Sequence, residues 1–167
     1  CTLDKKGNIE SIHFDNNESI DADFFVDCTG FSKILASKVG IKWKSYSKFL
    51  PVNSAIPFQI KYKENEKPNT FTSAHALSSG WMWEIPLSNR KGCGYVYDDN
   101  FITQDQAIDE LELQLGHKIE PIKHIQFDSG RSSEFWKKNV LVLGLSAAFV
   151  EPLEATSIHS TIIQLLI

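Results

Sequence analysis

Two short, almost wholly apolar runs constrain the fold of this chain more than any other feature. They are FFVDC at residues 24–28 and VLVLGL at residues 140–145. A helix-like segment follows each of them, namely SKILASKVG after the first and a run from about residue 156 after the second. Apolar runs of this length are typical of strands that are buried on both faces of an α/β sheet. The two ends of the chain therefore predict one α/β part.

The stretch between these two runs has a different character. Strand-like segments follow one another as VNSAIPFQIKY, TFTSAHAL, GWMWEIPL and KGCGYVYDD, and SNRKG between the last two suits a hairpin loop. Residues 103–116 predict a helix, because Ile108, Leu111 and Leu115 share one face and Thr103 with Gln106 matches a capping box. Residues 120–130 predict a further strand. Residues 130–139 predict a return loop.

These patterns together predict an α/β fold with an inserted lobe. Residues 1–44 and 138–167 are expected to form one domain, and residues 45–137 a β-rich lobe between its two pieces. The chain starts without Met and ends inside an apolar helical stretch that has no stop signal. We therefore interpret it as an internal piece of a longer protein.

Composition excludes several classes of function. The net charge is -4 and the lysines are scattered, which argues against a nucleic-acid partner. No apolar run is long enough to cross a bilayer, so we expect no membrane partner. The three cysteines show neither zinc nor disulfide spacing, and the five histidines show no metal-ligand pattern. We expect no metal site, a reduced cytoplasmic setting, and a buried Cys28 inside its apolar run.

The junction at residues 141–160, LVLGLSAAFVEPLEATSIHS, has the order strand, glycine-bearing loop, helix. Ligands of open α/β sheets bind beyond the carboxyl ends of the strands, and a helix start attracts anions through its unpaired N–H groups. A simpler interpretation is that Glu151, Pro152 and Glu154 only complement the helix dipole. The residues alone leave both interpretations open.

Three further features are ambiguous by themselves. Trp81 and Trp83, at spacing two, point to the same face of a strand, where they form either core or the wall of an aromatic site. Gly30 either lets a ligand approach the backbone or merely turns the chain. Arg131 is interpreted as an ion-pair residue, with a role in ligand binding as the less favoured alternative.

Three motifs in this order resemble the flavin-dependent tryptophan halogenase family. They are DFFVDCTGF, then GWMWEIPL with GCGYVYDDNF, and then GRSSEFWKKNVLVLGLSAAFVEPLEATSIH. The resemblance covers nearly the whole chain and is loosest at residues 1–20 and 40–70. It implies an FAD/NAD(P)-binding, Rossmann-like flavin monooxygenase fold with a β-rich substrate lobe.

The resemblance also implies an activity and its partners. Reduced FAD, O2 and chloride or bromide would give hypohalous acid, which travels through an internal tunnel and halogenates an electron-rich aromatic such as tryptophan. The partners would be this small aromatic substrate and a flavin reductase that supplies reduced FAD. Two alternatives are an FAD-dependent aromatic hydroxylase on the same scaffold and a non-catalytic flavin-binding relative.

The resemblance assigns roles to the carboxyl-terminal loop and helix. Glu154 matches the catalytic glutamate beside the substrate, and its carboxylate suits acid–base work at an aromatic ring. Thr156 and Ser157 match the halide site. The family commonly has glycine where Ser157 stands and serine where Ala155 stands. Donation by the Ser157 N–H therefore requires a backbone conformation that is open to serine.

The remaining assignments concern the cofactor and the tunnel. Leu145 and Ile158 match flavin-contacting positions, and we assign Gly30, Gly144 and Pro152 to the same cofactor site. Trp81 and Trp83 match the pair that lines the tunnel and keeps the substrate away from the flavin. The family's phosphate-binding GxGxxG and its lysine lie N-terminal to the matching region. We assign neither to any residue here, and we expect residues 1–167 alone to be inactive.

Overall fold

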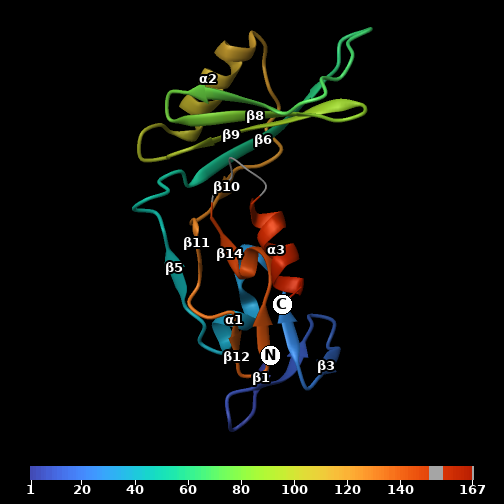
Figure 1. Ribbon diagram of the computed structural model, residues 1–167, viewed down its shortest axis with the longest axis vertical. Coiled ribbons are helices and arrows are strands. Elements are labelled where there is room, and N and C mark those ends of the chain that lie inside the picture. The colour runs from blue at the N-terminus through green and yellow to red at the C-terminus, as the bar shows by residue number, and fades with distance from the viewer. Residues whose placement is uncertain (151–155, 167) are drawn as a thin grey trace. The chain divides into compact units, whose positions relative to one another are not determined.

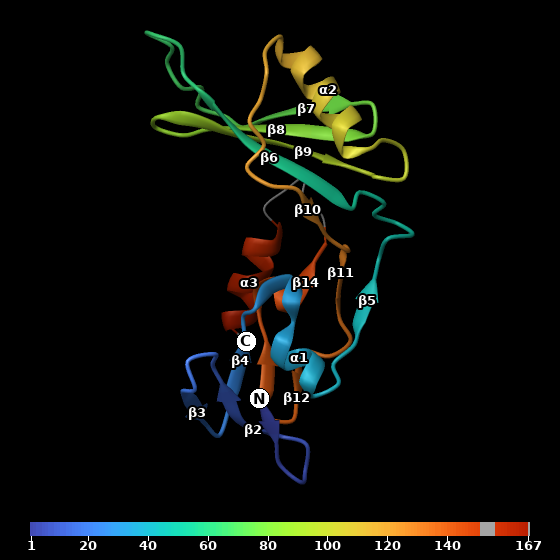
Figure 2. The same cartoon turned by 180° about the vertical axis from the view of Figure 1, so that it is seen from behind.

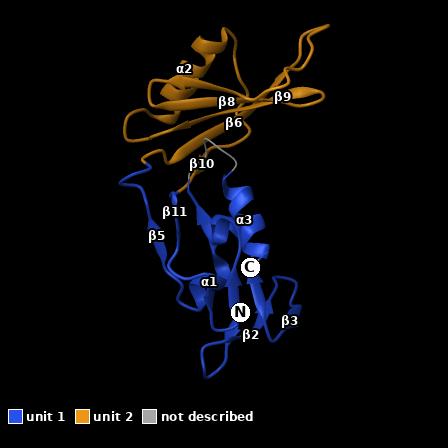
Figure 3. Ribbon diagram, in the orientation of Figure 1, with its two compact units in different colours: residues 1–50, 128–167 blue, residues 51–127 orange. Residues whose placement is uncertain are grey.

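The computed structural model describes residues 1–150 and 156–166 (Figure 1; from behind in Figure 2). The chain divides into two compact units, which Figure 3 colours separately. Unit 1 comprises residues 1–50 and 128–167, and unit 2 comprises residues 51–127. One unit is thus inserted into the sequence of the other. The domain boundaries expected after residues 44 and 137 stay predictions.

Unit 1, in its described part, contains three small sheets and two α-helices. The helices are α1 (Ile34–Lys38) and α3 (Thr156–Leu166). The first sheet consists of β1 (Thr2–Leu3), β2 (Ile9–His13) and β3 (Ser19–Asp21). The second sheet consists of β12 (Trp136–Lys137), β13 (Val140–Val142) and β4 (Phe25–Asp27). The third sheet consists of β14 (Ala148–Phe149), β11 (Gly130–Ser132) and β5 (Trp43–Ser45).

The two apolar runs form the adjacent parallel strands β4 and β13, with Phe25 opposite Val140 and Asp27 opposite Val142. Strands from the two ends of unit 1 therefore meet in one sheet, as predicted. The expectation that residues 24–28 are buried on both faces is wrong. Phe25 is buried, whereas Phe24 and Val26 are 41% and 46% exposed, because α1 and its neighbours pack on only one face of β4.

Three local expectations, two in unit 1 and one in unit 2, also need correction. Cys28 is exposed, because it lies beyond the last paired residue of β4. The expected strand at residues 120–130 shrinks to β10 (Ile125–Gln126). The expected loop at residues 130–139 instead contains β11 and β12, which pair with strands distant in sequence or across a tight turn.

Unit 2 is an antiparallel five-stranded sheet with a helix against one face (Figure 1). The strand order is β10-β6-β9-β8-β7. The elements added here are β6 (Ser54–Lys61), β7 (Ser73–Leu77), β8 (Gly80–Pro86), β9 (Arg90–Tyr97) and α2 (Gln104–Leu115). The strands and the β8–β9 hairpin were predicted from the alternation and turn chemistry of this region. They are confirmed.

The core of unit 2 lies between α2 and the sheet. Ala107 and Leu111 on the helix are fully buried against strand residues that all point to the same face, namely Ile56, Phe58, Met82, Cys93, Tyr95 and Tyr97. The helix begins with the predicted capping box. The Thr103 hydroxyl accepts the Gln106 N–H at 3.3 Å, and the Gln106 side-chain oxygen accepts the Thr103 N–H at 2.9 Å.

Replacing Thr103 with alanine should destabilise unit 2 by about 1 kcal/mol, within the range of roughly 0.5–2 kcal/mol for N-cap residues. The first-turn N–H of Gln106 loses its acceptor, while the apolar face of α2 is unchanged. Urea unfolding monitored by circular dichroism measures the difference. Gln114→Ala, at an exposed position of the same helix, is the control and should change stability little.

Helix α3 confirms the helix predicted at the end of the chain. Several of its apolar side chains are exposed, among them Ile158 at 66% and Leu165 at 67%. Within residues 1–150 and 156–166, no helix reaches the length and apolar composition of a membrane span.

Candidate functional site

Two glycine-bearing turns lie side by side beyond the carboxyl ends of β4 and β13. The first is the 3-10 turn η1 (Gly30–Ser32), and the second is the 3-10 turn η2 (Gly144–Ser146). Gly30 has φ of +66° and Gly144 has φ of +62°, a left-handed conformation that favours glycine. Among residues 1–150 and 156–166, a Cβ added at Gly30 would meet no atom within 4 Å. The structure therefore brings two predicted cofactor residues to one edge of the parallel sheet.

The carboxylate of Asp27 holds these two turns together. Its Oδ1 accepts hydrogen bonds from the N–H and hydroxyl of Thr29, at 2.9 and 2.7 Å, and from the hydroxyl of Ser146 at 3.1 Å. Its Oδ2 accepts the N–H groups of Leu35 and Ala36, at 2.9 and 2.8 Å, at the start of α1. The Ser146 hydroxyl also lies 3.1 Å from the Gly30 carbonyl. One side chain thus links β4, η1, α1 and η2.

Asp27 is fully buried and charged. Burial by itself raises the pKa of this carboxyl group. The hydrogen bonds from Ala36, Thr29 and Ser146 oppose that effect and hold the pKa below the ordinary value of 3.8. Sequence reasoning missed this residue, although an acidic side chain inside the apolar run FFVDC was the available signal. Charged residues are almost never fully buried unless they are paired or hydrogen-bonded.

The residues predicted to bind halide and flavin lie partly in η2 and partly in α3. Leu145 in η2 is 36% exposed, and Ile158 in α3 is 66% exposed. Thr156 and Ser157 form the first turn of α3, which packs against η2. Ser157 therefore has helical backbone that is open to serine. Glu151, Pro152 and Glu154 lie outside the described residues.

The tryptophan pair lies on the face of the unit 2 sheet that is turned away from α2. Trp81 and Trp83 project from the same side of β8, with ring centroids 6.0 Å apart and ring planes at 58°. Met82, between them in sequence, points to the opposite side and is 2% exposed in the core. Both indoles are half-buried. The pair shares one face, as predicted, and is not part of the described core of unit 2.

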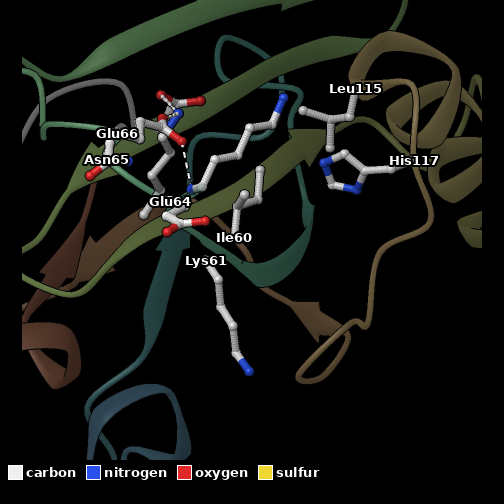
Figure 4. A pocket seen from close by; sticks show the side chains of 10 residues that line it. Ile60, Lys61, Glu64, Asn65, Glu66, Leu115 and His117 are labelled. Atoms are coloured by element: carbon white, nitrogen blue, oxygen red, sulfur yellow. Dashed lines mark hydrogen bonds and ion pairs between the residues drawn. The ribbon is translucent and has the colours of Figure 1, made fainter.

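A cavity of about 500 Å³ opens in unit 2 near the loop that follows β6 (Figure 4). In it the Lys91 ammonium lies 2.9 Å from a Glu66 carboxylate oxygen and 3.2 Å from one of Glu84. The hydrogen bond to Glu66, with that to Glu84, raises the pKa of Lys91 despite partial burial. The one ammonium of Lys91 thus pairs with two carboxylates. The cavity is not lined by any predicted site residue that the structure describes.

Two further expectations concern charged and metal-binding groups. Arg131 donates from Nε to the Tyr46 hydroxyl at 2.9 Å and from Nη1 to the Ser132 carbonyl at 2.9 Å. The ion pair expected for Arg131 is not found among residues 1–150 and 156–166. In the same part of the chain, no three His, Cys, Asp or Glu side chains are grouped to bind a metal ion.

The sequence matches one known protein family along almost its whole length. The sequence profile of the family described as tryptophan halogenase matches residues 1–166. The chain belongs to the tryptophan halogenase family. The two glycine turns and the tryptophan pair described above therefore lie in a member of the tryptophan halogenase family.

Individual members of the tryptophan halogenase family support the assignment. Tryptophan 7-halogenase RebH of Lentzea aerocolonigenes is 39% identical over 160 residues, which cover 93% of this chain and 30% of that protein. The crystal structure of tryptophan 6-halogenase SttH from Streptomyces toxytricini matches 99% of this chain with 38% identity and a TM-score of 0.90. BrvH, a flavin-dependent halogenase from Brevundimonas sp. BAL3, matches with 35% identity and a TM-score of 0.88 over 98% of this chain.

The chain spans about a third of the length of these relatives, for example 34% of SttH and 34% of BrvH. Within that span the expected fold class is confirmed. The chain is mixed α/β and strand-rich, and it shares the FAD-binding, Rossmann-type fold of the flavin-dependent halogenases.

Proposed function

We propose that this chain forms part of a flavin-dependent halogenase, which replaces a ring hydrogen of an electron-rich aromatic such as tryptophan with chlorine or bromine. The observation that carries the proposal is the match of the tryptophan halogenase family along residues 1–166. RebH and SttH, which are named tryptophan halogenases, add support. The reduced flavin would come from a separate flavin reductase, in a cytoplasmic setting.

The residues around η1 and η2 fit an FAD site. When bound, reduced FAD supplies the electrons that convert O2 and halide into hypohalous acid. Gly30 and Gly144 adopt a left-handed backbone without a Cβ, and no atom of the described residues would lie within 4 Å of a Cβ at Gly30. Leu145 and Ile158 offer exposed apolar surface to a ring system. Together with Pro152, these residues would hold the cofactor at the carboxyl edge of the parallel sheet, where α/β folds bind ligands.

The start of α3 would hold the halide. The helix dipole places partial positive charge at the start of α3. Thr156 adds a hydroxyl, and Ser157 adds a backbone N–H in a conformation that serine adopts without strain. An anion such as chloride or bromide suits such a site.

Glu154 would handle the proton at the substrate ring. As the carbon–halogen bond forms, the oxygen–halogen bond of hypohalous acid breaks and a hydroxide group leaves. The ring then loses its proton to the Glu154 carboxylate, and that proton and the hydroxide make water. A positioned carboxylate of this kind contributes a factor of about 10²–10⁴ in rate.

Trp81 and Trp83 would separate substrate from flavin. Two indoles on one open sheet face form a wide apolar wall. Such a wall prevents direct oxygen transfer from the cofactor to the ring, so that the substrate meets hypohalous acid instead. An aromatic hydroxylase, which needs its substrate beside the flavin, is not favoured, because the relatives named above are halogenases.

The test is product formation by the complete protein. It is given reduced FAD, O2 and either chloride or bromide, together with tryptophan and with other indoles, pyrroles and phenols. We expect mass spectrometry to show a halogenated product whose mass follows the halide supplied. A hydroxylated product with either halide, or flavin oxidation without any halogenated product across the panel, would contradict the proposed function.

A further inference from the structure

We propose that Gly94 positions the indole of Trp83, and that this residue therefore controls how well the tryptophan pair seals substrate from flavin. The positioning follows from the geometry of β8 and β9. The catalytic consequence rests on the function proposed above.

The indole of Trp83 occupies the space that a side chain at position 94 would need. Trp83 and Gly94 are directly opposed in the antiparallel β8–β9 pair, so their side chains would project from the same face. A Cβ built on Gly94 would lie 2.1 Å from both Cη2 and Cζ2 of Trp83 and 2.8 Å from its Cε2. The six-membered ring of the indole thus lies directly over the Gly94 backbone.

The residues opposite the two tryptophans on β9 differ, and this difference explains why only Trp83 can lie over the backbone of its opposing residue. Trp81 is opposed by Val96, which carries a branched side chain, whereas Trp83 is opposed by glycine. On the other side, both tryptophans face alanines of β7, at positions 76 and 74. Only Trp83 can therefore lie flat across β9, and the 58° between the two ring planes agrees with this difference.

The same strand provides a matched comparison. Gly92 lies two residues before Gly94, on the same face, and opposes Ile85. A Cβ at Gly92 would meet the Leu87 side chain at 3.7 Å and the Ile85 carbonyl at 3.9 Å, which are ordinary contacts. A methyl group is thus accommodated at position 92 and excluded at position 94. The three atoms nearest to a Cβ at position 94 all belong to the Trp83 indole, so this indole is what requires glycine there.

An alanine at position 94 would force the Trp83 indole off β9. The wall formed by the pair would then open on one side. Hypohalous acid would be lost to water before it reaches the substrate, while the oxidation of reduced flavin would continue. The expected signature is a loss of coupling, measured as halogenated product per flavin oxidised.

The first experiment compares Gly94→Ala with Gly92→Ala in the complete protein. The exciton couplet of the two indoles in the far-ultraviolet circular dichroism spectrum reports their mutual geometry without any substrate. We expect Gly94→Ala to change the couplet and to lower product per flavin about 10-fold or more, since displacing a positioned group by 1 Å can cost about 10²-fold. Gly92→Ala should leave both unchanged.

The second experiment repeats Gly94→Ala in a Trp83→Val background and compares melting temperatures. Gly94→Ala should lower Tm when the indole is present and have little effect when it is absent, because contacting residues show non-additive effects. Equal losses of Tm in both backgrounds, or an unchanged couplet in Gly94→Ala, would overturn the positioning role. A changed couplet with unchanged product per flavin would overturn its catalytic consequence.

These measurements separate the two proposals. If the wild-type protein makes no halogenated product, the proposed function fails, and the couplet and the Tm comparison still decide whether Gly94 positions Trp83.

Discussion

Asp27→Ala should remove at least about 3 kcal/mol of stability from unit 1, since the donors on the buried residues Leu35, Ala36 and Ser146 each cost about 1–3 kcal/mol when left without an acceptor. The donors that lose their acceptor are the Thr29, Leu35 and Ala36 groups at 2.7–2.9 Å and the Ser146 hydroxyl at 3.1 Å. A loss of this size is a large fraction of the roughly 5–15 kcal/mol that a domain possesses. Urea unfolding followed by circular dichroism measures it.

Two comparison variants make this prediction specific. Ser146→Ala removes one donor and keeps the carboxylate, so we expect a loss of about 1 kcal/mol. Asp21→Ala, at an exposed position of β3, should have almost no effect. If Asp27→Ala and Asp21→Ala destabilise the protein equally, the carboxylate does not hold the two turns together.

The same carboxylate predicts how the stability of unit 1 responds to acid. The pKa of Asp27 is lower in the folded protein than its ordinary value of 3.8. A group with a depressed pKa contributes its full stabilisation above its unfolded pKa, and that contribution is lost as pH falls through the folded pKa. The wild-type protein should therefore lose stability below about pH 4. Asp27→Asn, which is less stable at neutral pH, should lose less on acidification.

Glu154→Gln should reduce halogenated product by about 10²–10⁴-fold, while the protein still binds reduced FAD and the oxidation of that flavin continues. The reason is that the flavin and the Glu154 carboxylate act in different steps of the proposed mechanism. In that mechanism reduced FAD would supply the electrons for making hypohalous acid, and the Glu154 carboxylate would act only at the substrate ring. Product formation with supplied reduced flavin is measured beside flavin reoxidation, which is followed by absorbance.

Glu151→Gln is the matched control in the same loop. If Glu151 only complements the helix dipole, its loss should cost about 0.3–1 kcal/mol and should change halogenation little. Abolished halogenation in Glu151→Gln together with an active Glu154→Gln would mean that the catalytic carboxylate has been assigned to the wrong residue. Full activity in both variants would remove the catalytic role proposed for Glu154.

Features with a local cause could be predicted from the sequence. The capping box of α2 involves Thr103 and Gln106, whose hydrogen bonds connect residues three apart. The spacing of Trp81 and Trp83 was enough to place both on one strand face, because side chains alternate along any strand. Which face this would be was not predictable, since that depends on where α2 packs.

Features with a distant cause were missed or wrong. β11 and β12 have three and two residues, too few to show an alternating pattern, and they exist because of partners elsewhere in the chain. The exposure of Val26 depends on which elements cover β4, and no local pattern records that. Among the site residues, Gly30 and Gly144 were assigned to one cofactor site through the family resemblance. The Asp27 side chain that joins them became evident only once β4, η1 and η2 were adjacent.

The insertion of unit 2 also determines the order in which the chain folds. Pairing β4 with β13 closes a loop that contains the whole of unit 2, and the entropy lost on closure grows with the logarithm of loop length. Within unit 2, the two ends of the segment are already adjacent, because the Phe127 N–H donates to the Asn53 carbonyl at 2.9 Å. Once unit 2 has folded, the remaining loop is shorter, and closure costs about 1 kcal/mol less. We expect the β-rich lobe to fold first and so to accelerate formation of the parallel sheet that carries the glycine turns.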